Sequence, residues 1–363
     1  MGKILILGGT GAMGVFLVKR LSVSHEVYVT SRQPRTSSNN VKYIQGNALE
    51  YTFLKSVLNM RRWGAIIDFM SYNTEDFKRR YNEILASTDQ YIYLSSSRVY
   101  ANSVTPLTED SKRLLDVSND RDYLRSDDYA LAKARQEDLL RNSGKSNWTC
   151  IRPYMTYDTY RLDLGYFPKE LWLYRVLKGR IILFPKDVAT KYTTLTYGDD
   201  VAKRIALLVE NPEAIGKIFQ ITQQRHYTWK EIIDLYATIL RRKGYEMNVK
   251  YVDALPIKEP IYIYDRVYDR VFNSSRIERI SGDEYYVDVN DGLNECLNSF
   301  LTSPRFKTID WKKQAYWDKI LKEHTALSEI PNLSQRVLYL LFRYVVPYQF
   351  VWKILQFAKR VKI

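Results

Sequence analysis

The sequence predicts a doubly wound α/β fold on a parallel sheet, with a smaller C-terminal region and a basic amphipathic helical tail. Three observations support this class. Short apolar runs, typical of strands buried on both faces, alternate with helical patterns over residues 1–153. A glycine-rich turn follows the first apolar run. The 363-residue chain is 45% apolar and 26% charged, which is ordinary for a globular protein and excludes a disordered or fibrous one.

The elements of residues 1–153 follow one another along the chain. Strands are predicted over residues 4–7, 27–30, 41–45, 65–69, 91–95 and 149–152. Helices are predicted over residues 15–21, 53–58 and 127–141. Because helices separate most of these strands, we expect the strands to lie parallel in one sheet with helices on both faces.

A second region is expected over residues 154–330, where the alternation weakens and aromatic residues become frequent. Within it, residues 195–240 are expected to return to the sheet. The elements predicted there are a helix over 200–209, a strand over 218–222 and a helix over 229–241. Thr228 is predicted to be the N-cap of the last helix.

Charge and cysteine content limit the classes of function. The 55 basic and 41 acidic residues give a net charge of +14, which suits nucleic acid, an anionic membrane surface or anionic small molecules. Two cysteines and three scattered histidines have no metal-ligand spacing, so we expect neither a disulfide scaffold nor a metal site. No apolar stretch reaches about 20 residues, and the N-terminal run is too short for a signal peptide. A cytoplasmic protein is therefore expected.

The glycine-rich turn predicts a dinucleotide site. Gly8, Gly11 and Gly14 lie between the first strand and the first helix. Glycine at these positions allows a tight turn, close approach of a pyrophosphate and close helix–strand packing, while the helix N-terminus attracts the anion. We therefore assign cofactor binding to this turn, which comprises Gly8, Thr10, Gly11, Ala12, Met13 and Gly14.

The end of the second strand indicates which dinucleotide is bound. NAD sites usually place an acidic residue there to accept from the ribose 2′-hydroxyl. Here Ser31 and Arg32 end the strand, Arg35 follows, and the only acid, Glu26, is at the opposite end. An arginine pairs well with a 2′-phosphate. NADP(H) is favoured, and NAD(H) stays open.

A tyrosine, a lysine and a serine form the predicted catalytic group. Tyr129 and Lys133 are four residues apart on a predicted helix and so share a face, where the lysine cation would favour the phenolate. A tyrosine tuned in this way can exchange a proton near neutral pH. Ser96 follows the predicted strand 91–95, and a serine there can hydrogen-bond a substrate oxygen.

With these motifs the chain resembles an extended short-chain dehydrogenase/reductase of the NAD-dependent epimerase/dehydratase group, which acts on nucleotide sugars. Five segments match in the family's order over residues 3–240: Gly-Gly-Thr-Gly-Ala-Met-Gly, Leu-Ser-Ser-Ser-Arg-Val-Tyr, Tyr-Ala-Leu-Ala-Lys, Ile-Arg-Pro and Thr-Tyr-Gly-Asp-Asp-Val-Ala. The family's catalytic residues fall on Ser96, Tyr129 and Lys133. The resemblance implies a Rossmann domain over residues 1–153. The further cofactor contacts assigned with it are Asn47, Ala48, Phe69, Tyr129, Lys133 and Pro153.

The chain also departs from the family's pattern. The usual acid after the third strand is replaced by Asn47, and the usual His-Leu-Ala-Ala stretch reads Asp68-Phe69-Met70-Ser71. The usual glycine after Val-Tyr is Ala101. Sugar 4,6-dehydratases resemble one another in a Thr-Asp-Glu segment, where this chain has Ser96-Ser97-Arg98. The missing carboxylates make that dehydration an unfavoured reaction.

The resemblance implies that a keto or alcohol carbon of a nucleotide sugar is held against the nicotinamide. Tyr129 would protonate the oxygen, Ser96 would hydrogen-bond it, and Lys133 would tune Tyr129. With Arg32 favouring NADPH, we expect a 4-ketoreductase, with a 4-epimerase as the alternative. Polysaccharide biosynthesis and a homodimer would suit either enzyme. Substrate contacts are assigned to Ser97, Arg161, Lys186, Lys191 and Arg270.

An alternative of another class is a non-catalytic cofactor-sensing or RNA-binding relative. Such relatives commonly lack the pair formed here by Tyr129 and Lys133. No nucleic-acid-binding motif is present in the sequence. Nucleic acid is therefore the least favoured of the three partners that the charge suits.

Residues 331–363 contain six basic and no acidic residues among many apolar ones. One interpretation is an interfacial helix at an anionic inner-membrane surface. The other, which the sequence favours, is a helix pair packed on the body or on a second subunit.

Overall fold

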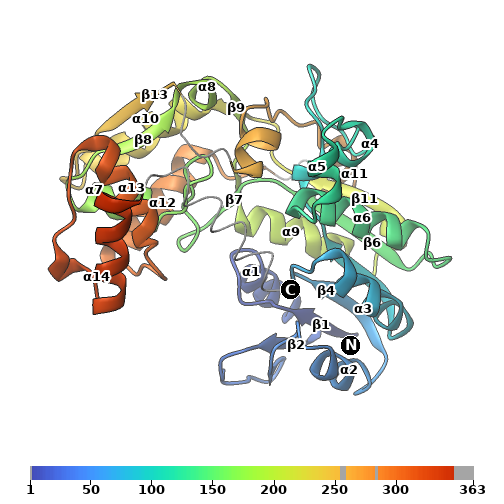
Figure 1. The fold of residues 1–363 in the computed structure, drawn as a ribbon. Helices are drawn as coiled ribbons and strands as arrows, with labels where there is room; N and C mark the ends of the chain where they lie inside the picture. Colours follow the sequence, from blue (N-terminus) through green and yellow to red (C-terminus); the bar gives the residue numbers. More distant parts are fainter. Residues whose placement is uncertain (1, 254–258, 283–284, 347–363) are drawn as a thin grey trace. The chain divides into compact units, whose positions relative to one another are not determined.

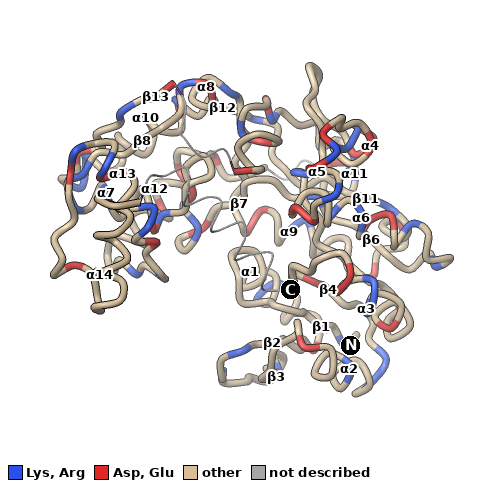
Figure 2. Tube along the Cα trace, in the orientation of Figure 1, with Lys and Arg blue, Asp and Glu red and all other residues tan. Residues whose placement is uncertain are grey.

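A computed structural model describes residues 2–253, 259–282 and 285–346, which form two compact units (Figure 1). The first unit comprises Met1–Tyr160, Thr194–His226 and Arg270–Gly292. The second comprises Arg161–Thr193, Tyr227–Asp269 and the chain from Leu293 onward. Basic and acidic residues are distributed over both units (Figure 2).

The first unit contains a seven-stranded parallel sheet, which confirms the predicted fold class. Its strand order is β11-β6-β5-β4-β1-β2-β3, so the chain reverses direction across the sheet after β3 and continues at β4. The bounds are β1 Lys3–Leu7, β2 Glu26–Ser31, β3 Val41–Gln45, β4 Trp63–Asp68, β5 Thr88–Leu94, β6 Trp148–Pro153 and β11 Lys217–Ile221. The carboxyl ends of β1 and β4 therefore flank the switch point, where ligands of open α/β sheets bind.

Two apolar cores cover the faces of this sheet. Along β1, Ile4 and Ile6 enter one core and Leu5 and Leu7 the other, because successive strand residues point to opposite faces. The first core is completed by α1 (Gly14–Leu21), α9 (Gly198–Leu208) and α11 (Ser275–Ser281). The second is completed by α2 (Tyr51–Leu58), α3 (Thr74–Ala86) and α6 (Tyr129–Arg141). Complete burial of the last four residues of β1, 4–7, explains their uninterrupted apolar sequence.

Short elements connect these layers. A 3₁₀ turn over Ser97–Val99 follows β5, and another over Pro212–Ala214 precedes β11. Two short helices, α4 and α5, precede α6, and the strand pair β7 and β10 follows β6. Their bounds are α4 Leu114–Val117, α5 Arg121–Arg125, β7 Thr156–Tyr157 and β10 Thr196–Tyr197.

The second unit is mainly helical, with two small strand pairs, β8 with β13 and β9 with β12. Its strands are β8 Ile182–Pro185, β9 Tyr192–Thr193, β12 Tyr227–Thr228 and β13 Val249–Val252. Its helices are α7 Trp172–Leu177, α8 Lys186–Ala189, α10 Trp229–Arg241, α13 Trp311–Leu321 and α14 Leu333–Leu340, while α12 (Val289–Thr302) begins in the first unit. Short 3₁₀ or π-helical segments cover Tyr262–Arg266, Leu327–Glu329 and Leu341–Val345.

Helix α10 begins as the sequence predicts. Thr228 accepts from the Glu231 backbone N–H, and the Glu231 carboxylate accepts from the Thr228 N–H in return. This reciprocal capping box confirms Thr228 as the N-cap. Trp229 and Tyr236 of α10 are buried inside the second unit, and the Tyr236 ring contacts Trp172 with centroids 4.7 Å apart. Of the predicted stretch 195–240, β11 thus joins the sheet, whereas α10 belongs to the second unit.

Candidate active site

The three glycines of the turn after β1 have three different surroundings. Gly8 has a φ of +71°, a conformation that side chains rarely adopt. A Cβ on Gly11 would meet nothing within 4 Å, whereas a Cβ on Gly14 would lie 2.6 Å from the Gly9 carbonyl carbon. These are the surroundings expected for a tight turn, a pyrophosphate approach and close helix–strand packing. The turn therefore fits a dinucleotide.

The start of helix α9 packs against this turn. A Cβ on Gly198 would lie 2.7 Å from the Ala12 carbonyl oxygen, so only glycine allows this approach. In the last turn of α1, Arg20 donates two hydrogen bonds of 2.7 Å to the Asp199 carboxylate. Gly198 and Asp199 thus hold α1, and with it the glycine turn, in place.

The end of β2 carries the residues predicted to select the cofactor. The Gly8 N–H donates to Thr30 Oγ1 at 3.0 Å, which joins the turn to β2. Arg32 follows β2 and is exposed, with no hydrogen-bond or ion-pair partner among the described residues. Ser31 is buried and donates to the Gln33 carbonyl oxygen, and the Arg35 guanidinium lies 5.8 Å from the Tyr43 ring centroid. A cation is thus available beside the turn.

The other predicted cofactor residues also lie at carboxyl ends of strands. Asn47 and Ala48 follow β3, and the Asn47 amide side chain donates to Glu50 and accepts from the Leu49 N–H. The Phe69 N–H donates to the Leu7 carbonyl oxygen at 3.0 Å, just beyond β4. Pro153 is the last residue of β6. All four positions therefore belong to the sheet edge where the glycine turn lies.

Tyr129 is the first residue of α6, and two cations lie near its ring. Asp128 caps the helix by accepting from the Ala130 N–H. The Lys133 ammonium lies 5.8 Å from the Tyr129 ring centroid, and the Arg98 guanidinium lies 5.0 Å from it. Tyr129 is 38% exposed, so the residue is open to solvent. The spacing in the sequence predicted the proximity of Lys133, whereas no sequence signal assigned a role to Arg98.

The Lys133 ammonium is buried, with 2% of the side chain exposed, and is held by backbone oxygens. It donates to the Leu94 carbonyl oxygen at 2.7 Å and to the Met70 carbonyl oxygen at 3.5 Å. Leu94 is the last residue of β5, and Met70 follows the end of β4. Burial lowers the pKa of Lys133, and the negative charges that Tyr129 and Asp68 can carry oppose this shift.

Asp68, the last residue of β4, is a fully buried carboxylate, and in the sequence it stands out only as a departure from the family's pattern. It accepts hydrogen bonds from the Met70 N–H at 2.9 Å, the Tyr91 hydroxyl at 2.8 Å and the Tyr72 hydroxyl at 3.1 Å. Burial raises the pKa of the Asp68 carboxyl, while these donors and Lys133 favour its ionised form. In the sequence, the signal available for this buried carboxylate was an aspartate at the end of an otherwise apolar strand.

The three serines after β5 have separate partners. Ser95 donates to the Glu137 carboxylate at 2.5 Å, and Ser97, fully buried, donates to the Arg152 carbonyl oxygen at 2.9 Å. Ser96 Oγ accepts from the Arg98 N–H at 3.2 Å, and its own proton has no acceptor among the described residues. Ser96 is therefore the serine whose O–H is available to a substrate oxygen, and Arg98 links it to the Tyr129 ring.

A buried ion pair joins α6 to β6. The Arg152 guanidinium donates to Glu137 at 2.6 and 2.8 Å, and both side chains are fully buried. Arg152 also donates to the Glu109 carbonyl oxygen at 2.9 Å, and Arg113 lies 3.5 Å from Glu137. Burial by itself would raise the pKa of Glu137. Arg152 and the Ser95 hydroxyl lower this pKa by more than burial raises it, so the net shift is downward.

The predicted substrate-binding residues are divided between the units. Arg270 belongs to the first unit, is buried, and donates to the carbonyl oxygens of Tyr100 and Ala101. Arg161, Lys186 and Lys191 belong to the second unit. There Arg161 pairs with Asp163 at 3.2 Å and Lys186 with Asp253 at 2.7 Å.

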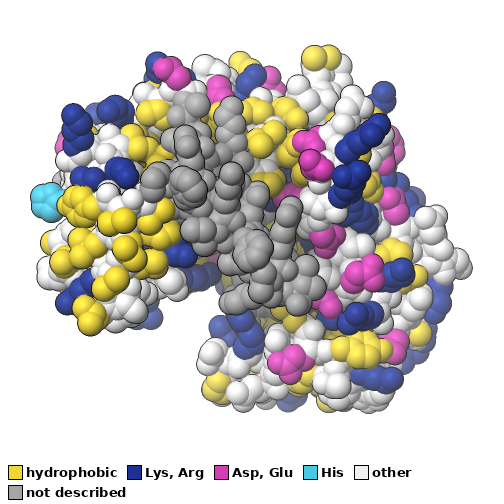
Figure 3. Space-filling view, in the orientation of Figure 1, with side chains coloured by type: hydrophobic (Ala, Val, Ile, Leu, Met, Phe, Trp, Pro, Cys, Tyr) yellow, Lys and Arg dark blue, Asp and Glu magenta, His cyan; other side chains and the backbone are white. Residues whose placement is uncertain are grey.

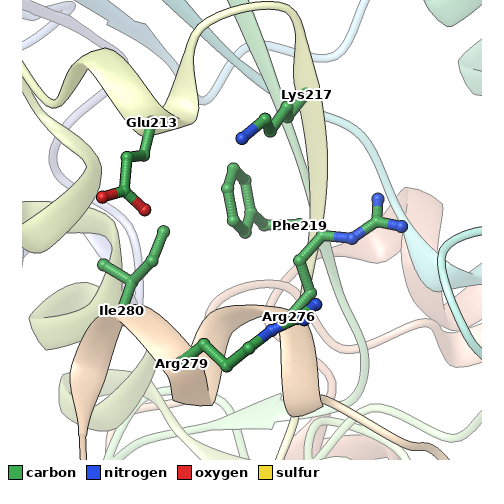
Figure 4. Close-up of a pocket in the computed structure, with 6 residues that line it drawn as sticks. All are labelled: Glu213, Lys217, Phe219, Arg276, Arg279 and Ile280. Atoms are coloured by element: carbon green, nitrogen blue, oxygen red, sulfur yellow. The ribbon is translucent and has the colours of Figure 1, made fainter.

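A separate cavity of about 530 Å³ lies at the amino end of β11 (Figure 4). Phe219 lies in its wall, and the other lining residues are Glu213, Lys217, Arg276, Arg279 and Ile280. Arg276 donates to the Asp110 carboxylate at 2.9 Å. Because β11 begins here, this cavity is at the opposite end of the strand from the glycine turn and is no part of the dinucleotide site.

A glycine turn at the switch point of a parallel sheet and a Tyr-Lys pair on one helix face define an extended short-chain dehydrogenase/reductase. The model of the NAD dependent epimerase/dehydratase family matches residues 4–222, more than half of the chain. The chain belongs to this family. A search of curated proteins finds no match.

Solved structures of low sequence identity share the fold. The epimerase Mth375 from Methanothermobacter thermautotrophicus has a TM-score of 0.64 at 13% identity, over 83% of this chain and 92% of that one. A dTDP-glucose 4,6-dehydratase from Bacillus anthracis, in complex with NAD, has a TM-score of 0.65 at 14% identity, over 84% and 97%. A UDP-N-acetylglucosamine 4-epimerase from Methanobrevibacter ruminantium, in complex with UDP-N-acetylmuramic acid, has a TM-score of 0.65 at 16% identity, over 83% and 98%.

Proposed function

We propose that the protein is an NADPH-dependent 4-ketoreductase of nucleotide sugars. The observation that carries the proposal is the position of Tyr129, with the Lys133 and Arg98 cations near its ring at the end of the sheet that holds the glycine turn. Arg32, in place of an acid after β2, supports NADP(H) over NAD(H).

The dinucleotide, when bound, supplies the hydride, and the chain's residues supply the proton and the positioning. The Tyr129 hydroxyl donates its proton to the substrate oxygen, so that the C=O group becomes an alcohol with one new C–H and one new O–H bond. The phenolate that remains is stabilised by Lys133 and Arg98. Ser96 Oγ–H hydrogen-bonds the same oxygen and stabilises the charge that develops on it.

A 4-epimerase is the second candidate, because solved structures with this fold are named as epimerases and include a UDP-N-acetylglucosamine 4-epimerase. It would use the same residues in both directions on a retained dinucleotide. A dehydratase is not proposed, since Ser97 and Arg98 offer no carboxylate pair. A non-catalytic cofactor-sensing or RNA-binding role would leave Tyr129 and Lys133 without a purpose.

The proposal includes the setting of the enzyme. The nucleotide-sugar substrate would be held by cations of the second region, with Arg161, Lys186 and Lys191 as the proposed contacts. A cytoplasmic homodimer that contributes to polysaccharide biosynthesis fits this chemistry. Peripheral contact of residues 331–363 with the inner membrane surface is part of the proposal, although residues 347–363 lie outside the described residues.

The test is stoichiometry. Purified protein is incubated with NADPH and a 4-keto-6-deoxy nucleotide sugar, and the loss of NADPH absorbance is compared with the alcohol formed. One NADPH consumed per alcohol supports the reductase. Interconversion of two nucleotide sugars without consumption of NADPH would replace it by the epimerase. Binding of the dinucleotide without turnover of any sugar would favour the non-catalytic role.

A further inference from the structure

The outer side of α14 is apolar where a helix of a water-soluble protein is usually polar. Six large side chains, each between 38% and 73% exposed, form this surface, which we call the α14 face. They are Leu333, Val337, Leu340, Leu341, Tyr344 and Val345. Figure 3 shows apolar side chains gathered where α14 lies in Figure 1.

The spacing of these residues places them on one side of the helix. Positions 333, 337, 340, 341, 344 and 345 recur at intervals of three and four, which is the period of a single helical stripe. Ser334 is the one polar residue between Leu333 and Val345 that is classed as exposed. A contiguous exposed apolar patch of this kind marks an interaction surface rather than ordinary solvent contact.

Polar contacts on the inner side fix the rotation of α14. Tyr339 is buried, and its hydroxyl donates to Asp318 of α13 at 2.7 Å while accepting from the Thr325 N–H at 2.8 Å. Arg343 donates to the Glu323 carbonyl oxygen at 2.8 Å, and Phe342 packs against the core of the second unit. Turning the helix to bury the α14 face would break these hydrogen bonds in a buried setting, so the face stays outward.

The charge around the α14 face is positive. Residues 331–346 contain Arg336 and Arg343 and no acid, and α13 adds Lys312 and Lys319. The carboxylates close by are already paired, because Asp318 and Glu323 share Arg175. Glu329 likewise pairs with Arg180.

We propose that the α14 face docks on the surface of an anionic lipid bilayer. The apolar side chains would enter the boundary between headgroups and acyl chains, and Arg336 and the exposed Lys319 would meet the lipid phosphates. A symmetric pairing with a second copy is less suited to this face, because it would bring two acid-free basic helices together. Among the described residues no helix has the length and hydrophobicity to cross a bilayer, so the contact is peripheral. The inference does not depend on the reaction proposed above.

Vesicle flotation of the full chain tests the proposal. We expect the protein to float with vesicles of phosphatidylcholine and phosphatidylglycerol, less at high salt, and not with phosphatidylcholine alone. The variant Leu333→Ser/Val337→Ser/Leu341→Ser should partition at least about tenfold less, because its apolar insertion is lost. The control Val23→Ser/Val104→Ser removes two apolar side chains that are 80% and 103% exposed in the first unit and should float like the wild type.

Two further measurements keep the outcome decisive. Circular dichroism and thermal unfolding should be the same for the wild type and both variants, because all substituted side chains are exposed. The proposal is overturned if the wild type fails to float with anionic vesicles, or if the α14 variant floats as well as its control. It is equally overturned if the variant instead converts a dimer into a monomer in sedimentation equilibrium without changing flotation, since a second copy would then cover the face.

Discussion

Lys133 and Asp68 are joined through the backbone of Met70. The Lys133 ammonium donates to the Met70 carbonyl oxygen at 3.5 Å, and the Met70 N–H donates to Asp68 Oδ1 at 2.9 Å. The carboxylate thus anchors the residue whose carbonyl group faces the lysine, and it adds a negative charge near the ammonium. Two tyrosine hydroxyls hold the carboxylate in turn.

Replacing Asp68 by asparagine should therefore change the pH dependence of the reaction. Burial lowers the pKa of Lys133, and the Asp68 charge partly opposes this, so its removal lowers the pKa further. The ammonium is present below its pKa and lost above it. The alkaline limb of the kcat/KM profile for NADPH oxidation should accordingly move to lower pH in Asp68→Asn.

The control for this prediction is Asp89→Asn, at an exposed aspartate paired with Arg62. It should leave the profile unchanged. Fluorescence titration of NADPH at several pH values gives a readout that does not require a substrate. A uniform loss of rate in Asp68→Asn, with the limb in its original place, would reduce Asp68 to a structural role.

Tyr129→Phe should greatly lower turnover and spare cofactor binding. The substitution removes only the hydroxyl that donates the proton, and general acid catalysis typically contributes about 10²–10⁴-fold. The ring, its two neighbouring cations and the glycine turn remain. Rates of NADPH oxidation and NADPH affinity should be measured beside Tyr285→Phe, at a tyrosine that is 91% exposed. Wild-type turnover in Tyr129→Phe would remove the residue from the mechanism.

Two glycines of the turn should respond differently to alanine. Gly11 has open space where a Cβ would stand, so Gly11→Ala should fold normally and weaken NADPH binding by crowding the pyrophosphate. A Cβ on Gly14 would overlap the Gly9 backbone, so Gly14→Ala should lower the free energy of unfolding by about 1–3 kcal/mol. Thermal unfolding and NADPH titration of both variants separate the effects. Equal destabilisation of the two would contradict the assignment.

The sheet was predictable because its signals are local. The apolar runs of β1, β2 and β4 and the glycines after β1 each depend on neighbours in sequence. The role of Asp68 was not predictable, because its partners Tyr72 and Tyr91 come from separate segments that only the fold brings together. Likewise, the composition of residues 331–363 indicated an amphipathic helical tail but could not show that polar contacts of Tyr339 turn its apolar side outward.

Arg32 should decide the choice of dinucleotide. Arg32→Asp replaces the cation after β2 by the acid that usually accepts from the ribose 2′-hydroxyl, and it would repel a 2′-phosphate. A charge-assisted contact is worth about 1.5–3 kcal/mol, so NADPH affinity should fall by about tenfold to a hundredfold while NADH affinity is retained or improves. The control is Arg121→Asp, at an exposed arginine of α5. Parallel losses for both dinucleotides would show that Arg32 does not read the phosphate.

The buried pair of Glu137 and Arg152 should make the first unit sensitive to acid. The pKa of Glu137 is lower in the folded state than in the unfolded chain. The pair therefore stabilises the fold at pH values above the ordinary glutamate pKa. That stability is lost as the pH falls through the folded-state pKa, when the carboxylate gains its proton. Glu137→Gln leaves Arg152 buried without its counter-charge and should cost about 3–5 kcal/mol at neutral pH.

Denaturant unfolding between neutral and acidic pH measures this effect. The difference in unfolding free energy between the wild type and Glu137→Gln should shrink as the pH falls, because protonation removes the same charge from the wild type. Glu83→Gln, at a half-exposed glutamate of α3, provides the matched control and should cost little at any pH. A pH-independent difference would mean that packing, and not the charge of Glu137, supports α6 and the Tyr129 and Lys133 side chains on it.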